Sequence, residues 1–487
     1  MDGLTFFFLI AGGYCVLLFF DVFFKSCCHY PYLQLLENLG INISYFTIKW
    51  KTKALNRLII KWGNARPQFW KVWFSIGTFT SLAFLPISIY IIFISIYWLF
   101  FNSTSQVSEP LISPVVPGLN LPVSELGYYS IALLICSIVH ELGHALAAVI
   151  EDVGTLELGC NVYFILPVAF VSLPTDKLYA INHKKRLGIV SAGVWHNIVL
   201  SFIAYLLYCS LPTIFSPLYN YGDSVSVSGV NKNSPLNDPT KGLSVDDIII
   251  AINNCDILNE NYWYHCLHDR YVLRPAVCIK SDLVNTLDES VPLKHLGSGY
   301  VECCDPKNSK NICFEYIDNE TNELELPGHV CLPGRTVMEQ SANFCTKSPH
   351  SCPSDSYCFQ PVLPNDTYLF KIITNTKNII YLGNPNDLFQ TMDISSYVKK
   401  TNLFSVSFPE KVTKLVKYIV VISLGLAFVN ILPFAFMDGE YILQTLALII
   451  FTNIVDKKKI VQTVNVITWI STIILIVYLV YSLFLLL

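Results

Sequence analysis

The chain has 487 residues, of which 53% are hydrophobic and 14% are charged, and its formal net charge is −4. Soluble domains contain about 25% charged residues, so this composition excludes an ordinary soluble protein. The small negative charge also argues against a nucleic-acid partner, which would require a basic surface.

Six apolar segments are long enough to cross a bilayer, which takes about 20 residues of helix. The predicted spans are 4–24, 74–101, 127–150, 187–212, 412–434 and 463–487. The first lacks a basic leading region and a cleavage site of small residues, so we expect a retained anchor and not a signal peptide. Two further apolar runs, 159–174 and 440–455, are too short or too interrupted for a span and are expected to be re-entrant or interfacial.

Positively charged residues predict the side of the membrane on which each loop lies. Residues 25–73 contain eight Lys or Arg and one acidic residue, Glu37, so this loop is expected in the cytosol. Residues 102–126 contain no Lys or Arg and are expected in the lumen. The basic runs at 184–186 and 457–459 indicate two further cytosolic turns. The polar region between the fourth and fifth predicted spans should therefore lie in the lumen.

The cysteines of this polar region, residues 213–411, support a lumenal location. An even number of cysteines in a polar stretch is typical of disulfides formed in an oxidising compartment, and no paired CxxC spacing supports metal ligation instead. Sequons at Asn319 and Asn365 are glycosylation candidates on the same side, whereas the sequon at Asn42 would stay unused in the cytosol. Ten of the 16 cysteines belong to this set: Cys255, Cys266, Cys278, Cys303, Cys304, Cys313, Cys331, Cys345, Cys352 and Cys358.

The start of the lumenal region has the pattern of a PDZ module. Within residues 224–258, alternating valines predict a strand, a Ser-Pro-Leu triplet at 234–236 can open a short helix, and residues 248–252 form an apolar strand. PDZ modules bind extended peptides by strand addition. The cysteine-rich stretch is expected to be inserted in this module or appended to it.

These features predict a polytopic α-helical membrane protein of about six spans, with a lumenal PDZ-like α/β module that carries a disulfide-rich insertion. Four regions follow from this organisation. They are an N-terminal anchor with a basic cytosolic loop (1–73), a membrane core (74–212), the lumenal domain (213–411) and a second membrane core with the last span (412–487).

The third predicted span contains the sequence HELGH, from His140 to His144. Residues four apart project from the same helix face, so the two imidazoles can chelate one Zn²⁺, and Glu141 lies close enough to act on a metal-bound water. HExxH also occurs in proteins that bind no metal, and these side chains could instead form hydrogen bonds to neighbouring helices. Ionisable groups inside a span cost several kcal/mol unless they are paired or hydrated, so their position here indicates a function.

A catalytic zinc site needs a third protein ligand and an open fourth position. The segment from Asn430 to Gly439 ends the fifth span and contains Asp438 in an apolar surround. Pro433 inside the span predicts a broken helix, which exposes side chains around a membrane site. Asp-Gly is also a common helix-terminating pair, and such a turn is compatible with a ligand. Asp438 is therefore the predicted third ligand of one zinc ion.

Together these motifs resemble the site-2 protease family of intramembrane zinc metalloproteases. The resemblance rests on HELGH, on Asn430-x-x-Pro433-x-x-x-x-Asp438-Gly439 and on the small-residue segment 191–197 that ends in an Asn. The PDZ-like module and the cysteines that follow it are similar to the animal-type members of the family. The resemblance covers most of residues 74–440.

The resemblance implies a role for each motif residue. His140, His144 and Asp438 would hold one Zn²⁺ per chain, and Glu141 would take the proton of the attacking water and pass it to the leaving amine. His196 is expected to be structural or interfacial, and Asn197 could equally contact the substrate or a neighbouring helix. The candidates for contact with the substrate or the reaction intermediate are Asn197, Asn430, Pro433 and Gly439.

The resemblance also implies the substrates and the compartment. The substrates would be single-span membrane proteins, in particular membrane-anchored transcription factors already cut once in the lumen, as in sterol regulation and the unfolded protein response. The implied location is the Golgi and endoplasmic reticulum system, with the active site inside the lipid bilayer towards the cytosol. Two other functions remain open, a zinc or ion transporter and an inactive PDZ scaffold. Replacing Glu141 separates a protease from a transporter, and absence of stoichiometric zinc from the purified protein would favour the scaffold.

Overall fold

The structure is a computed structural model, and it divides into two compact units. The first unit comprises Met1–Cys209 with Thr413–Leu487, and the second is Ser210–Val412. The residues described are 3–101, 120–232, 234–238, 242–269, 274–296, 300–305, 307, 310–317, 327–340, 343–345, 352–364 and 366–486. The sequons at Asn319 and Asn365 lie outside the described residues.

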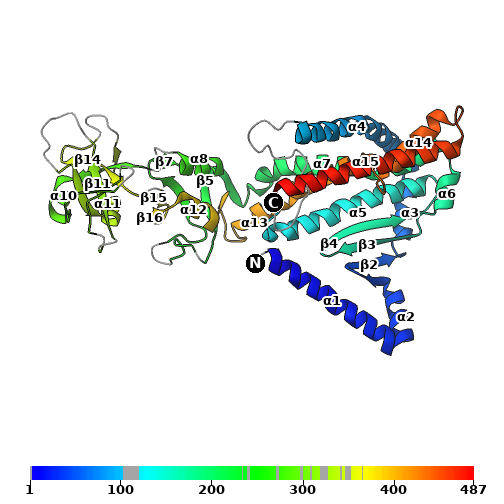
Figure 1. The fold of residues 1–487 in the computed structure, drawn as a ribbon, viewed down its shortest axis with the longest axis horizontal. Coiled ribbons are helices and arrows are strands. Elements are labelled where there is room, and N and C mark those ends of the chain that lie inside the picture. Colours follow the sequence, from blue (N-terminus) through cyan, green and yellow to red (C-terminus); the bar gives the residue numbers. More distant parts are fainter. Residues whose placement is uncertain are drawn as a thin grey trace. The chain divides into compact units, whose positions relative to one another are not determined.

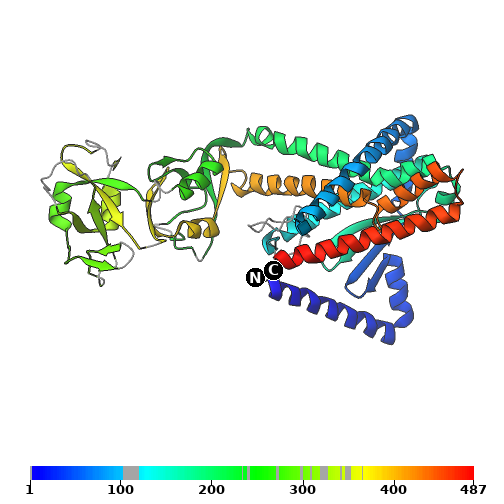
Figure 2. The same cartoon turned by 45° about the horizontal axis from the view of Figure 1, so that its top comes forward.

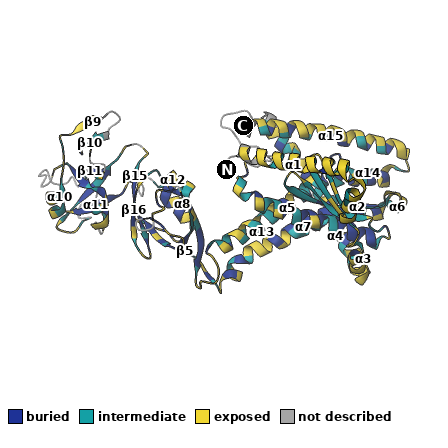
Figure 3. Cartoon of the chain, turned by 90° about the horizontal axis from the view of Figure 1, so that it is seen from below, coloured by how far each residue is buried: buried dark blue, intermediate teal, exposed yellow. Residues whose placement is uncertain are grey.

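Six helices among the described residues are long and apolar enough to cross a membrane, which confirms the predicted number (Figure 1). Much of the surface of α1 and α15 is exposed (Figure 3), and in α1 the exposed residues include Phe7, Phe8 and Phe19. Helices with apolar outer faces are suited to contact with lipid. The six helices are α1 (Gly3–Cys27), α4 (Pro67–Phe101), α5 (Leu126–Ile150), α7 (His183–Phe215), α13 (Ser407–Ile431) and α15 (Lys457–Leu486).

Shorter helices complete the first unit. Figure 2 shows α1 and α2 meeting at an angle beside a small sheet. The apolar run at 440–455 forms α14 over most of its length, and this helix packs against α15 and is too short to span. The short elements are α2 (His29–Leu39), α3 (Asn56–Ala65), η1 (Val123–Glu125), α6 (Thr175–Ala180) and α14 (Asp438–Phe451).

A four-stranded antiparallel sheet lies beside α5. Its strand order is β1 (Ile41–Ser44), β2 (Thr47–Thr52), β3 (Glu157–Tyr163) and β4 (Leu166–Ser172). Most of the apolar run at 159–174 therefore forms the β3–β4 hairpin within the first unit. Its re-entrant or interfacial position stays a prediction. Ser137 Oγ accepts a hydrogen bond from the Ala169 amide at 3.0 Å. Because strands rise about 3.3 Å per residue and helices 1.5 Å, β4 extends along most of α5.

The tips of the β1–β2 hairpin and the β3–β4 hairpin lie beside the middle of α1. The Tyr14 hydroxyl donates to the Phe164 carbonyl at 2.8 Å, and the rings of Phe46 and Phe164 stack with centroids 5.0 Å apart. Part of the basic loop 25–73, the β1–β2 tip, therefore packs with the β3–β4 tip beside the middle of α1. The cytosolic side of the loop stays a prediction. The charge pattern of the loop does not show that it pairs with strands more than 100 residues later.

The second unit contains a six-stranded sheet that includes the predicted PDZ-like segment. The sheet order is β16-β15-β6-β5-β17, with β7 paired to β6, and its core includes Val225, Ile249 and Phe370. Its strands are β5 (Tyr219–Val230), β6 (Ile248–Ile252), β7 (Cys255–Asp256), β15 (Tyr368–Thr374), β16 (Asn378–Gly383) and β17 (Met392–Lys399), and its helices are α8 (Glu260–His268) and α12 (Pro385–Thr391).

The cysteine-rich stretch forms a second sheet, inserted between α8 and β15. This five-stranded sheet has the order β12-β11-β14-β8-β13, and β9 pairs with β10 beside it. Its strands are β8 (Ala276–Lys280), β9 (Lys294–Leu296), β10 (Tyr300–Glu302), β11 (Asn311–Tyr316), β12 (His329–Pro333), β13 (Phe344–Cys345) and β14 (Ser356–Val362), and its helices are α10 (Ser281–Leu287) and α11 (Gly334–Gln340).

The predicted disulfide framework is confirmed. All ten cysteines of residues 213–411 form disulfides, namely Cys255–Cys266, Cys278–Cys352, Cys303–Cys313, Cys304–Cys331 and Cys345–Cys358. One bridge joins β7 to α8 in the PDZ-like sheet, and four lie in the insertion. Each removes chain entropy from the unfolded state, which stabilises sheets with small hydrophobic cores.

Candidate metal centre

Helix α5 presents two imidazoles on one buried face. His140 and His144 lie one turn apart, and their Nε2 atoms are 3.2 Å from each other. At 1.5 Å per residue, His140 lies roughly 21 Å along the helix from Leu126 and 15 Å from Ile150. The pair therefore lies inside the span and not at its end.

A break between two helices brings Asp438 to these histidines. Helix α13 ends at Ile431, the chain turns through a non-helical segment that contains Pro433, and α14 begins at Asp438. A side chain on Gly439 would collide with the carbonyl oxygens of Ile431 and Leu432, so glycine permits this tight return. Asp438 Oδ2 lies 3.0 Å from His140 Nε2 and 3.2 Å from His144 Nε2.

The three atoms match the geometry of a small metal ion. Zn–N and Zn–O bonds of about 2.0–2.1 Å in a tetrahedron place neighbouring ligand atoms roughly 3.3–3.4 Å apart. The observed separations of 3.0 to 3.2 Å come close to this value. Two nitrogens and one oxygen are also a ligand set that zinc accepts. His140, His144 and Asp438 therefore fit a metal that retains one open position.

Helix α7 leaves space beside these ligand atoms. A Cβ atom on Gly193 would lie 2.6 Å from His140 Nε2 and would collide with His144 Nε2. Across the same contact, a Cβ on Gly143 of α5 would lie 2.6 Å from the Ala192 carbonyl oxygen. The two glycines thus allow α5 and α7 to approach closely while the space next to the imidazoles stays free.

A backbone carbonyl orients His144. Its Nδ1 lies 2.8 Å from the carbonyl oxygen of Ile189 on α7. Because a carbonyl can only accept, Nδ1 carries the hydrogen and Nε2 keeps its lone pair towards Asp438. Metal-binding histidines are commonly held in this way by their second ring nitrogen.

Asn197 lies against the second ring nitrogen of His140. Its side-chain nitrogen is 3.1 Å from His140 Nδ1, and its buried side-chain oxygen has no hydrogen-bond partner among the described residues. The two ends of an amide are distinguished by their partners. Turned over, the amide presents its oxygen to a protonated Nδ1, which leaves His140 Nε2 free for a metal. The backbone oxygen of Asn197 also accepts from Ser423 Oγ at 2.9 Å, which joins α7 to α13.

Strand β4 holds Glu141. The Val171 amide donates to Glu141 Oε2 at 2.9 Å, so one carboxylate oxygen is fixed. The other carboxylate oxygen is not used by this contact. Glu141 lies between the two histidines on α5, and the hydrogen bond from Val171 therefore anchors its carboxylate beside the metal centre.

His196 has a structural place, as expected. Its Nδ1 lies 3.3 Å from the Val139 carbonyl, and the indole nitrogen of Trp73 donates to its Nε2 at 3.2 Å. Both ring nitrogens are thus used between α4, α5 and α7. Asn430 is half-buried in the last turn of α13.

Several residues of the centre were not predicted individually. Gly193 belongs to the small-residue segment 191–197, but no role was predicted for it. Its small size was the signal that could have identified it. Ile189 and Val171 contribute backbone atoms, which no side-chain pattern reports.

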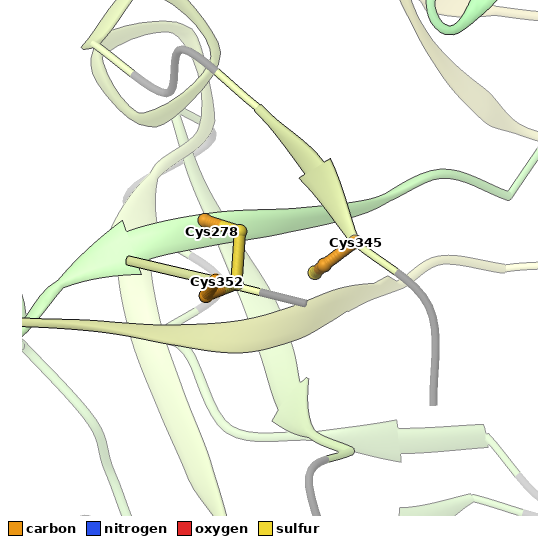
Figure 4. A group of neighbouring side chains, drawn as sticks. All are labelled: Cys278, Cys345 and Cys352. Carbon is orange, nitrogen blue, oxygen red and sulfur yellow. A yellow bond between two sulfur atoms is a disulfide. The ribbon is translucent and has the colours of Figure 1, made fainter. Parts of the chain in front are cut away.

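A second group of potential ligands is already occupied. The ligand atoms of Cys278, Cys345 and Cys352 lie within 4.8 Å of one another. Figure 4 shows Cys278 and Cys352 joined by a disulfide, with Cys345 beside them. Because Cys345 is bridged to Cys358, none of these sulfurs is a free thiolate. Metal ligation by this group is therefore excluded.

Comparison with known proteins identifies the family. The model of peptidase family M50 matches residues 128–475. The membrane-bound transcription factor site-2 protease homolog of Arabidopsis thaliana is 25% identical over an alignment of 480 positions, which includes 87% of this chain and 89% of that protein. The matched region contains His140, His144 and Asp438, and it spans well over half of the chain. The chain therefore belongs to peptidase family M50 and is an integral membrane metallopeptidase.

Proposed function

We propose that this protein is a zinc-dependent intramembrane protease that hydrolyses a peptide bond in or near the transmembrane segment of a single-span substrate. The observation that carries the proposal is the convergence of His140, His144 and Asp438 from two helices at a depth inside the spans. Glu141 beside them completes the set of groups that a zinc peptidase needs.

The residues of the site divide the chemistry among them. Zinc held by the two imidazoles and Asp438 would supply a Lewis acid that polarises the scissile carbonyl and lowers the pKa of water. Glu141 accepts the proton of the attacking water and returns it to the leaving nitrogen. The hydrogen bond from Val171 keeps the carboxylate in reach during both transfers.

The membrane imposes two requirements on this reaction. Water must reach the centre, and the shorter path along α5 leads to Ile150, the end on the predicted cytosolic side. A substrate helix hides its peptide bonds in hydrogen bonds and must unwind locally before attack. We therefore expect substrates with helix-weakening residues near the cut.

The resemblance and the name of the Arabidopsis relative support a proposal on the substrate class, and the resemblance supports one on the compartment. We infer that the substrates are membrane-anchored transcription factors already cut once on the lumenal side. The disulfide-bonded second unit supports placing residues 213–411 in the lumen of the Golgi and endoplasmic reticulum system. Its PDZ-like sheet could exclude substrates whose lumenal parts are still bulky.

Replacing Glu141 by Gln tests the protease function. Loss of the general base is expected to slow cleavage about 10²–10⁴-fold, while zinc stays bound because no ligand changes. The measurement is release of a cytosolic fragment from a single-span reporter, alongside zinc content. Glu37→Gln, an exposed change on α2, is the control and should cleave normally. Undiminished cleavage by Glu141→Gln would refute the proposal and favour a transporter.

Asn197 is proposed to position His140. Asn197→Leu removes the acceptor for Nδ1–H and should weaken zinc binding about 10–100-fold, as for other outer-shell partners. Asn197→Asp keeps an acceptor and should retain zinc. The measurement is the rate of zinc loss to a chelator. Equal loss in both variants, with no rescue by Asp, would show that Asn197 does not act through His140.

A further inference from the structure

A cavity of about 270 Å³ with three lysines in an otherwise largely apolar wall lies between α4, α5 and α7, and none of its lining residues is a proposed metal ligand. Three lysines line it, Lys71 from α4 and Lys184 and Lys185 from α7. The hydroxyl residues Ser75 and Thr78 of α4 also line the cavity. Since water occupies about 30 Å³ per molecule in the liquid, the cavity has room for a phosphate group and its ester substituent.

The cavity carries an excess of positive charge. Lys185 forms an ion pair with Glu151 at 2.7 Å, and Glu151 is the single acidic residue in the lining. Lys71 and Lys184 form no ion pair within the described part of the chain. Two ammonium groups are therefore available as donors to one anion.

The position of the cavity indicates where that anion comes from. Helix α4 begins at Pro67, α5 ends at Ile150 and α7 begins at His183, so three span ends meet around it. Span ends lie at the depth of lipid headgroups. The basic loops predict that this side faces the cytosol, where anionic lipids are concentrated, and basic pockets between spans bind their headgroups.

We propose that this cavity binds the headgroup phosphate of an anionic membrane lipid, with Lys71 and Lys184 as its principal contacts. The cavity wall also includes Gly188 and Ile189 of α7. The Ile189 carbonyl is the group that orients His144, so a bound headgroup packs against the same segment of α7 that positions this metal ligand.

The test measures lipid retention by the full chain, and the Glu141→Gln protein serves as well because binding needs no catalysis. The chain is reconstituted in phosphatidylcholine with phosphatidic acid, and bound lipid is measured by native mass spectrometry. One phosphatidic acid per chain should be retained in preference to phosphatidylcholine. Displacement by millimolar inorganic phosphate would overturn the proposal, because the ligand would then be a soluble anion.

One double variant and one control double variant locate the site. Lys71→Gln with Lys184→Gln should weaken phosphatidic acid binding about 30-fold, because each lysine near an anionic surface contributes about fivefold. Lys61→Gln with Lys177→Gln removes the same charge from exposed positions outside the cavity and should leave binding unchanged. Equal weakening by the two pairs would overturn the proposal, because binding would then reflect the general charge of this face.

A third variant fills the cavity and leaves its charge intact. A Cβ on Gly188 would meet only Thr78 Oγ1, at 3.8 Å, so Gly188→Leu directs a larger side chain into the free space. It should abolish the preference for phosphatidic acid while zinc content stays unchanged. Undiminished retention of phosphatidic acid by Gly188→Leu would place the lipid elsewhere and contradict the proposal.

Discussion

Gly193→Ala is expected to abolish zinc binding and, with it, proteolysis. The added methyl carbon would lie 2.6 Å from His140 Nε2 and would collide with His144 Nε2, in the space beside the ligand atoms. Close-packed interiors tolerate such insertion poorly, and here the metal competes for the same volume. We expect at least about a tenfold fall in bound zinc and no detectable reporter cleavage.

The matched control for Gly193→Ala is Gly188→Ala, on the same helix. A Cβ there meets only Thr78 Oγ1 at 3.8 Å, an ordinary contact. Zinc per chain is measured by elemental analysis, and thermal unfolding checks that both variants fold. A folded Gly193→Ala protein with a full complement of zinc would show that the metal binds away from this face of α7.

Asp438→Asn is expected to cause the second large loss of zinc binding. The amide keeps the size of the side chain but removes the negative charge that lies 3.0 and 3.2 Å from the two histidines. Because Asp438 is a direct ligand, zinc affinity should fall by more than the roughly 100-fold seen when an outer-shell partner is lost. Cleavage of the reporter should fall with it.

Glu440→Gln is the control for Asp438→Asn. Glu440 lies two residues further along α14, where its carboxylate accepts from the Phe436 amide at 2.9 Å. It shares the local turn but does not contact the histidines among the contacts described. Titration with a zinc chelator compares the two proteins. Equal zinc affinities for Asp438→Asn and the unchanged chain would remove Asp438 from the ligand set.

The sequence predicts the spans and the cysteine framework because both depend on local composition. Twenty apolar residues in a row and ten cysteines in one polar stretch leave few alternatives. The pairing of the two histidines in HELGH was also predictable, because helical spacing alone brings His140 and His144 together. Asp438, almost 300 residues away, could be found only by asking which acid in another span could complete a zinc site.

The remaining features depend on contacts that local patterns do not encode. The sheet pairs β2 with β3 across more than 100 residues and brings Phe46 onto Phe164, a contact that the charge pattern of the loop does not predict. The hydrogen bonds from Val171 to Glu141 and from His144 to Ile189 use backbone atoms, which every residue type has. Gly193 matters because it has no side chain, which leaves free the volume beside the rings of His140 and His144. Only the close crossing of α5 and α7 shows that this volume must stay free.

The central claim is that one zinc ion is held by two imidazoles and one carboxylate from α5 and α14. X-ray absorption at the zinc edge of the purified full chain tests it most directly. We expect one zinc per chain with nitrogen and oxygen neighbours at about 2.0–2.1 Å and no sulfur. A sulfur shell at about 2.3 Å, or zinc that remains bound in Asp438→Asn with an unchanged spectrum, would contradict it.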